Sequence, residues 1–165
     1  MFTFTTLASG STGNAALVSC GDTHILLDAG ISAKRLTAGL AELGVKPHQL
    51  SAILLTHEHS DHVSGLRVFT KKAGAPIYAT PPTCREWYRK NQCDQVKDLF
   101  QPLEAGAGTQ IGALWVESFP TPPRRGGQRG LVHRRRGGTH GAVHRPGPHH
   151  RAGPPGGGGL RPAGV

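Results

Sequence analysis

Four residues with metal-binding side chains occur within one short stretch of the chain, namely His57, His59, Asp61 and His62. Neutral imidazole and carboxylate are the ligands of open, catalytic zinc sites, and the stretch has no cysteine of the kind found in closed structural sites. It directly follows Leu50–Leu55, an apolar run that predicts a buried strand. Since residues two apart in an extended segment point the same way, His57 and His59 can bind one ion. Asp61 and His62 begin the next turn and are better placed for a second ion.

Two adjacent divalent ions polarise a substrate oxygen and lower the pKa of a shared water to near neutrality, which generates hydroxide. We therefore interpret this stretch as the centre of a metal-dependent hydrolase that holds two divalent ions. Zinc is the favoured metal and manganese the alternative. Asp61 is the candidate catalytic residue as well as a ligand. The competing interpretation is a solvated polar loop with clustered histidines, which does not explain the position directly after a buried strand.

The first 120 residues alternate between strand-like and helix-like segments, which predicts a layered α/β domain. The expected strands are Phe2–Leu7, Ala15–Cys20, His24–Asp28, Leu50–Leu55, Ile77–Ala79 and Trp115–Phe119. The expected helices are one capped by Ser32 that runs to about Leu43, and two more at Val63–Ala73 and Pro82–Asn91.

The run from His57 to His62 matches the H-x-H-x-D-H signature of metallo-β-lactamase-fold hydrolases. Two further segments, Leu7–Asn14 and Leu26–Gly30, resemble the N-terminal motifs of the YycJ (WalJ) branch of that fold. The resemblance implies that residues 1–122 form the N-terminal half of an αβ/βα sandwich, with the four ligands divided between two ions as above. It also implies that Asp28 orients the histidine loop, although a simple turn residue is nearly as good an interpretation. A plain glycine-rich turn is the favoured interpretation of residues 9–14.

Resemblance to this branch implies phosphodiester hydrolysis on DNA, as an exonuclease, with a metal-bound hydroxide as the nucleophile. Nucleic acid would then be the substrate, whereas no membrane partner is expected and the oligomeric state is not predicted. The fold also includes thioester, lactam and RNA hydrolases, among which the motif alone does not choose. No apolar run suits a membrane span, and Cys20, Cys84 and Cys93 lack metal-type spacing, so we interpret them as reduced thiols of a cytoplasmic protein.

The net charge of +9 comes entirely from the last part of the chain. Residues 1–120 contain ten Lys and Arg and ten Asp and Glu, whereas residues 121–165 contain nine Arg and neither an acidic nor an aromatic residue. Rich in Gly and Pro, this segment cannot bury enough apolar surface to offset the entropy of ordering it. We therefore expect residues 123–165 to be a disordered basic tail.

Members of the family continue with His-Asp where this chain has Pro123-Arg124, and neither of these side chains can bind a metal. If the coding sequence is read one base later, common codons for Pro123 to Arg125 allow His-Asp at this position. In the same shifted frame, common codons for His144 to His149 allow Thr-Asp-Leu-Gly-His, which resembles the family's motif for a bridging Asp. We hypothesise that residues 123–165 translate a shifted frame, so that the domain is incomplete.

The alternative is a non-enzymatic fragment whose arginine- and glycine-rich arm binds nucleic acid. Four ligands on one loop leave each ion about two protein contacts, against the three typical of catalytic zinc. We therefore expect this chain to be inactive or nearly so.

Overall fold

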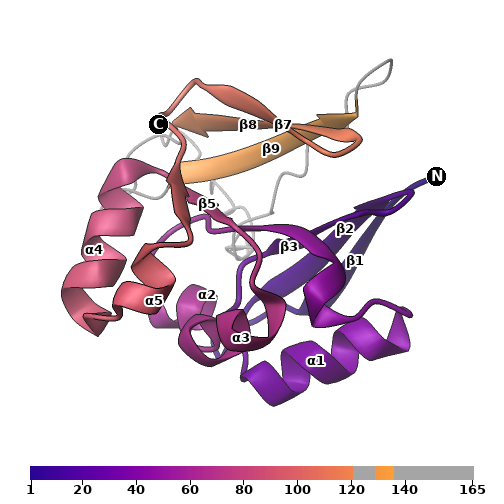
Figure 1. The fold of residues 1–165 in the computed structure, drawn as a ribbon, viewed down its shortest axis with the longest axis horizontal. Coiled ribbons are helices and arrows are strands. Elements are labelled where there is room, and N and C mark those ends of the chain that lie inside the picture. The colour runs from indigo at the N-terminus through magenta and orange to yellow at the C-terminus, as the bar shows by residue number, and fades with distance from the viewer. Residues whose placement is uncertain (121–128, 136–165) are drawn as a thin grey trace, which may run out of the picture.

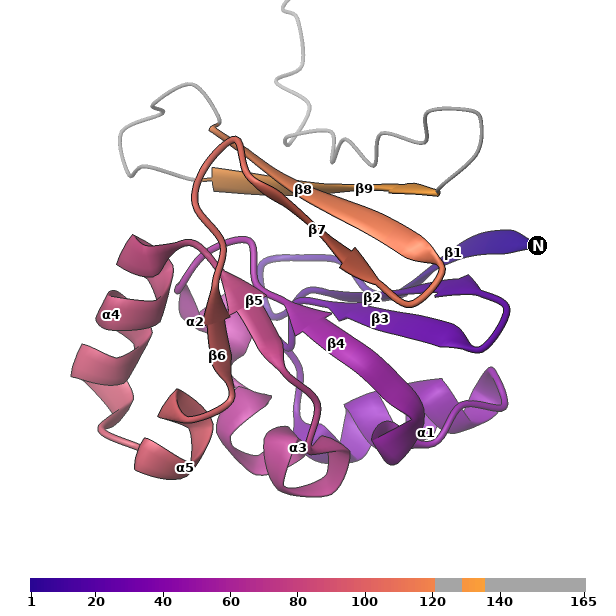
Figure 2. The same cartoon turned by 45° about the horizontal axis from the view of Figure 1, so that its top comes forward.

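The computed structural model describes residues 1–120 and 129–135, which form two sheets and a layer of helices (Figures 1 and 2). The larger sheet has its six strands side by side in chain order. They are β1 (Phe2–Ala8), β2 (Ala15–Cys20), β3 (Thr23–Leu27), β4 (Leu50–Leu54), β5 (Ile77–Ala79) and β6 (Phe100–Pro102). Pairing is antiparallel from β1 to β3 and parallel from β3 to β6. The smaller sheet is antiparallel and consists of β7 (Gly108–Ile111), β8 (Leu114–Pro120) and β9 (Arg129–Arg135).

The helices cover one face of the larger sheet, and the smaller sheet covers the other, as Figure 2 shows. They are α1 (Ala33–Glu42), the 3₁₀ turn η1 (Pro47–Gln49), α2 (Ser60–Val63), α3 (Leu66–Ala73), α4 (Pro81–Asn91) and α5 (Asp94–Lys97). The layered α/β architecture predicted from the sequence is therefore confirmed. In the part of the chain that the structure describes, no helix has the length and apolar composition that crossing a bilayer requires.

Strand β2 shows why the central strands are apolar on both sides. Ala15 and Leu17 face the cluster under the helices, whereas Ala16 and Val18 face the cluster between the two sheets. A strand that is buried on both faces has a continuous apolar sequence instead of an alternating one. Strand β3 is also buried on both faces. Leu26 faces the helices, whereas Ile25 and Leu27 face the cluster between the two sheets.

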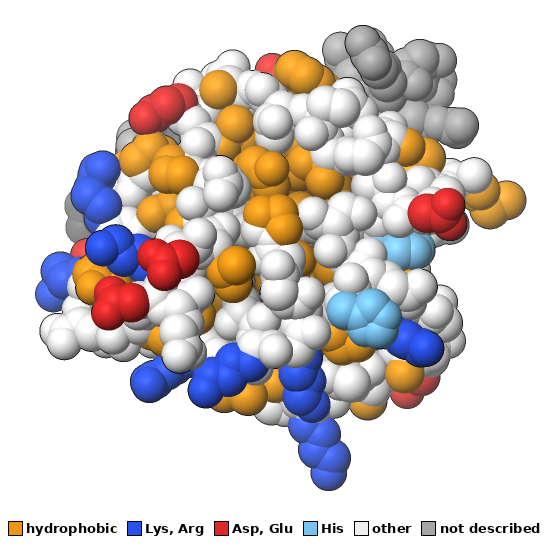
Figure 3. All heavy atoms as spheres, viewed as in Figure 1, with side chains coloured by type: hydrophobic (Ala, Val, Ile, Leu, Met, Phe, Trp, Pro, Cys, Tyr) orange, Lys and Arg blue, Asp and Glu red, His pale blue; other side chains and the backbone are white. Residues whose placement is uncertain are grey.

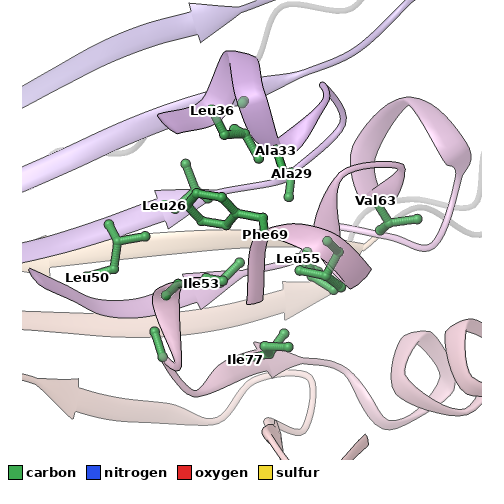
Figure 4. Packing of buried hydrophobic residues seen from close by; sticks show 14 of the residues in the cluster. Leu26, Ala29, Ala33, Leu36, Leu50, Ile53, Leu55, Val63, Phe69 and Ile77 are labelled. Carbon is green, nitrogen blue, oxygen red and sulfur yellow. The ribbon is translucent and has the colours of Figure 1, made fainter. Parts of the chain in front are cut away.

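The cluster under the helices is organised around large side chains that are wholly buried. Phe69 of α3 has no exposed surface and lies over β3 and β4, among Leu26, Ile53 and Leu36 (Figure 4). Helix α1 begins where the sequence predicts, because the Ser32 hydroxyl accepts a hydrogen bond from the Arg35 amide at 3.3 Å.

The single helix expected over Val63–Ala73 is wrong in one respect, since the structure divides this part of the chain between α2 and α3. Gly65 stands between the two helices and packs against the segment after β3. Its amide donates to the Ala29 carbonyl at 2.8 Å, and a Cβ at this position would lie 2.0 Å from the Ile31 carbonyl oxygen. The break is therefore caused by a contact between distant parts of the chain.

Several short elements were not predicted, among them β6, β7, α5 and η1, which have three or four residues each. Most of the disordered tail expected at residues 123–165 lies outside the described residues, namely residues 123–128 and 136–165. One segment of it, Arg129–Arg135, is strand β9, which pairs antiparallel with β8.

Two adjacent residues of α3 provide a test of this packing. We expect Phe69→Ala to lower the free energy of unfolding by about 3–5 kcal/mol, because it removes a wholly buried ring and leaves a cavity. Val68→Ala should change it by less than about 0.5 kcal/mol, because Val68 is 56% exposed. Urea unfolding of both variants measures the difference, and similar values for the two would contradict the described orientation of α3.

Candidate metal centre

The candidate metal ligands lie at the edge of the larger sheet where two parallel strands end. Asp28 directly follows β3, and the loop with the histidines, residues 56–62, which we call the metal loop, begins two residues after β4. Because β3 and β4 run parallel, their carboxyl ends meet at the same edge. The Asp28 carboxylate Oδ1 accepts hydrogen bonds from the Thr56 amide at 2.9 Å and from its hydroxyl at 3.0 Å, which fixes the start of the loop.

The structure brings three of the four predicted ligands together. One ligand atom from each of His57, His59 and Asp61 lies within 4.8 Å of the other two. In a tetrahedral zinc site with bonds of about 2.0–2.2 Å the ligand atoms lie roughly 3.3–3.6 Å apart, so the side chains have to close in by at most about 1.5 Å to share one ion. His57 is buried, whereas His59 is exposed and Asp61 half-buried, so the group opens to solvent on one side. These donors fit a divalent metal ion.

His62, the fourth predicted ligand, lies beside this group and is oriented by Asp28. Its Nδ1 is 2.7 Å from the Asp28 carboxylate Oδ2. Since a carboxylate only accepts hydrogen bonds, Nδ1 carries the hydrogen and Nε2 is left able to bind a metal. That Nε2 is 3.3 Å from the Asp61 Oδ2, so the two ligands expected on a second ion are neighbours. The contact expected between Asp28 and the histidine loop is present, whereas the division of ligands between two ions remains a prediction.

The histidine rings are close enough to influence one another. The centroid of the His57 ring lies 4.7 Å from that of His59 and 3.9 Å from that of His62. Burial, and next the nearby His62, lower the pKa of His57 to about 4. His57 is therefore neutral at physiological pH, which is the protonation state that binds metal ions.

Asn14 contacts two of the candidate ligands, a position that the interpretation of residues 9–14 as a plain turn does not predict. Its side-chain amide donates to the Asp61 Oδ2 at 3.0 Å and lies 3.1 Å from the His62 Nε2. Its carbonyl Oδ1 accepts from the Gly10 amide at 3.0 Å. The backbone of Asn14 also bonds to the Asp61 carbonyl at 2.8 Å and to the Gly30 amide at 2.9 Å. Asn14 thus joins the turn, the segment after β3 and the metal loop; the only sequence signal for it was the resemblance of Leu7–Asn14.

Gly30 allows these three segments to approach closely. A Cβ at this position would lie 1.7 Å from the Asp61 carbonyl oxygen and 2.7 Å from the Asn14 amide nitrogen. Real Cβ atoms essentially never come this close, so any other residue would push the metal loop away. The Ser64 hydroxyl completes the connection by donating to the Gly30 carbonyl at 2.7 Å.

The structure therefore combines a mixed sheet covered by helices with a group of metal-ligand side chains at the carboxyl ends of β3 and β4. Residues 8–158 match the family model of the metallo-beta-lactamase superfamily, and the chain belongs to this superfamily.

Two curated relatives are similar to this chain. It is 38% identical over 119 residues to "Exodeoxyribonuclease WalJ" of Streptococcus pneumoniae serotype 2 (strain D39 / NCTC 7466), which covers 72% of this chain and 44% of the relative. It is 44% identical over 118 residues to "Exodeoxyribonuclease YycJ" of Bacillus anthracis, which covers 70% of this chain and 44% of the relative. The chain thus spans less than half the length of these relatives.

Solved structures share the fold. The Rm3 metallo-beta-lactamase aligns with a TM-score of 0.63 and 23% identity, over 75% of this chain and 51% of that one. The MIM-2 metallo-beta-lactamase aligns with a TM-score of 0.65 and 20% identity, over 81% of this chain and 54% of that one. At this level of identity the likeness establishes the fold alone.

We expect Asn14→Ala to weaken zinc binding by roughly 10–100-fold, because the Asp61 carboxylate loses the amide that holds it in place. Competition with a chromophoric chelator measures the affinity, and the absorption spectrum of the cobalt-substituted protein reports on the ligand geometry. Asn91→Ala is the matched control, since Asn91 bonds the Trp87 carbonyl at 2.8 Å on α4, away from the metal loop. Equal zinc affinity in both variants would show that Asn14 does not position Asp61.

The low pKa of His57 predicts that the metal-free protein loses stability in acid. Between about pH 6.5 and pH 4 the unfolded chain binds a proton at His57 that the folded chain does not, so the free energy of unfolding falls as the pH falls through this interval. Urea unfolding in the presence of a chelator should show a shallower fall for His57→Gln than for the unmodified chain. His48→Gln, which changes an exposed histidine, should retain the original dependence. A wild-type pH dependence in His57→Gln would contradict the assignment.

Proposed function

We propose that this chain is a metal-dependent phosphodiesterase that acts on DNA as an exonuclease. The observation that carries the proposal is the convergence of His57, His59 and Asp61 at the open edge of the sheet. The names of the two curated relatives support DNA as the substrate. Divalent ions bound here would supply Lewis acidity to the phosphoryl group and to an attacking water.

The side chains around the ligands keep them ready for this chemistry. Asp28 holds His62 in the tautomer whose Nε2 is available to a metal ion, and the Thr56 hydroxyl bonds Asp28 at the start of the metal loop. Asp61 is assigned two roles, as a ligand and as the carboxylate that accepts a proton from water. Its side chain is 32% exposed, so substrate can reach it from the solvent side.

We also propose that the site holds two ions, zinc in preference to manganese, because imidazole and carboxylate are the ligands of catalytic zinc sites. We further propose a cytoplasmic location, because all three cysteines are free thiols, two of them buried.

A second candidate is a non-enzymatic fragment that binds metal weakly and nucleic acid through its arginine-rich end. It is favoured by the length of the chain, which spans 44% of the curated relatives, and by Pro123-Arg124 in place of the family's His-Asp. Those relatives match over 118 and 119 residues, about the length that precedes the change in composition. A shifted frame from residue 123 accounts for both features, and it is the reason we expect slow turnover.

Metal content and nuclease activity distinguish the two candidates. We expect the purified chain to bind divalent metal in stoichiometric amounts, measured by mass spectrometry, and to release nucleotides slowly from labelled DNA with zinc or manganese. Asp61→Asn should lower the rate by roughly 10²-fold or more, because it removes a proton acceptor and a charged ligand. His48→Gln, outside the site, should leave the rate unchanged.

A chain that binds no metal would refute the proposal. Metal binding with no hydrolysis above the Asp61→Asn rate, together with retained DNA binding, would establish the non-enzymatic candidate.

A further inference from the structure

The basic residues of the first 120 positions are confined to one layer of the molecule. All ten Lys and Arg lie in helices or at the start of η1, and none lies in a strand: Lys34, Arg35, Lys46, Arg67, Lys71, Lys72, Arg85, Arg89, Lys90 and Lys97. Six of the ten acidic residues lie outside the helices, in loops and strands, namely Asp22, Asp28, Glu58, Asp98, Glu104 and Glu117, and a seventh, Asp61, lies in the four-residue helix α2 of the metal loop. The longer helices therefore carry an excess of positive charge.

The excess is concentrated on α1 and α3, which pack against each other. Five cations on these helices are exposed, and together we call them the basic α1–α3 surface: Lys34, Arg35, Arg67, Lys71 and Lys72. Glu42 is the sole acidic residue of the two helices. Among residues 1–119, whose side chains the structure describes, none of the five forms an ion pair.

Helix α4 shows the contrasting case. There Arg89 and Lys90 both pair with Glu86, at 2.7 and 3.4 Å. Figure 3 shows Lys and Arg side chains along the lower edge of the molecule, where Figure 1 places α3 and α1, and acidic side chains among the basic ones over α4 and α5. The cations of α1 and α3 are thus available to an external anion, whereas two of those on α4 share one carboxylate.

The basic α1–α3 surface begins next to the metal centre. Helix α1 follows the Asp28–Ser32 segment, and α3 follows the metal loop by way of Gly65. The two starting points are joined, since the Gly65 amide donates to the Ala29 carbonyl at 2.8 Å. Arg67 is therefore two residues beyond a contact that ties the metal loop to the start of α1. Helices α1 and α3 thus both start from segments that are bonded to each other beside the metal loop.

We propose that the basic α1–α3 surface binds the sugar–phosphate backbone of the DNA strand whose end is at the metal centre. The choice of DNA rests on the proposed function, and the choice of a phosphate chain rests on charge complementarity with unpaired cations. A membrane surface is disfavoured, because Val68 is the one large apolar residue on the exposed face of α3 and an interfacial helix needs an apolar stripe.

The salt dependence of DNA binding tests this proposal in the full chain. Binding of labelled single-stranded DNA is measured in chelator, so that neither hydrolysis nor metal loading affects the result. Each phosphate contact contributes about 0.7 to the slope of log K against log salt. The triple variant Arg67→Gln, Lys71→Gln and Lys72→Gln should therefore lower the magnitude of that slope by about 2 and weaken binding at low salt.

The matched control removes three charges elsewhere in the helical layer, by Arg85→Gln, Lys90→Gln and Lys97→Gln. It has the same net charge and retains the same C-terminal arginines, so the α3 variant should lose more affinity and more slope. Equal slopes in the two variants would overturn the proposal. Stronger binding to anionic phosphatidylglycerol vesicles than to DNA would also overturn it, in favour of a lipid surface.

Zinc content is measured for both variants and should match that of the unmodified chain. A chain that binds no zinc refutes the proposed function but leaves the DNA-binding result readable, so the two failures are distinguishable.

Discussion

The hydrogen bond between the Asp28 carboxylate and the His62 imidazole is the interaction on which the rest of the site depends. It joins the end of β3 to the metal loop after β4, across 34 residues of sequence, with a distance of 2.7 Å. Both side chains are buried, so water competes little for the contact. The same contact determines which ring nitrogen of His62 faces Asp61. Fold and metal chemistry are therefore coupled through one carboxylate.

The Asp28 carboxylate reaches His62 because the N-terminal turn, the segment after β3 and the metal loop are in close contact. Gly30 lets the Asp61 carbonyl approach the backbone after β3, and Asn14 bonds both segments. Outer partners of metal ligands fix the orientation of those ligands and raise their affinity for the ion. The N-terminal turn is thus part of the support for the metal loop, although it contains none of the ligands.

The parts of the structure that could be predicted from the sequence are those that depend on local spacing. The ligand types after an apolar strand predicted the metal loop, and five of the six strands of the larger sheet were predicted from their composition. The break between α2 and α3 could not be predicted, because it depends on the close approach of Gly65 to Ala29 and Ile31, more than 30 residues away in the sequence. The role of Asn14 likewise depends on a partner 47 residues away. Strands β6 and β7, of three and four residues, contain too few positions to show a period and, unlike β5, have few apolar residues to mark them.

The distribution of charge follows from the requirements of the metal centre. A Lys or Arg side chain beside the metal loop would compete with a metal ion for Asp61 and Asp28. The sequence avoids this competition locally, since no Lys or Arg lies between Lys46 and Arg67. The acidic residues of this interval, Glu58 and Asp61, lie in the metal loop instead. A polyanionic substrate would be repelled by these carboxylates unless cations elsewhere attracted it. The helices that flank the loop in the chain, α1 and α3, carry such cations, and none of these cations pairs with Asp28 or Asp61 among the described residues.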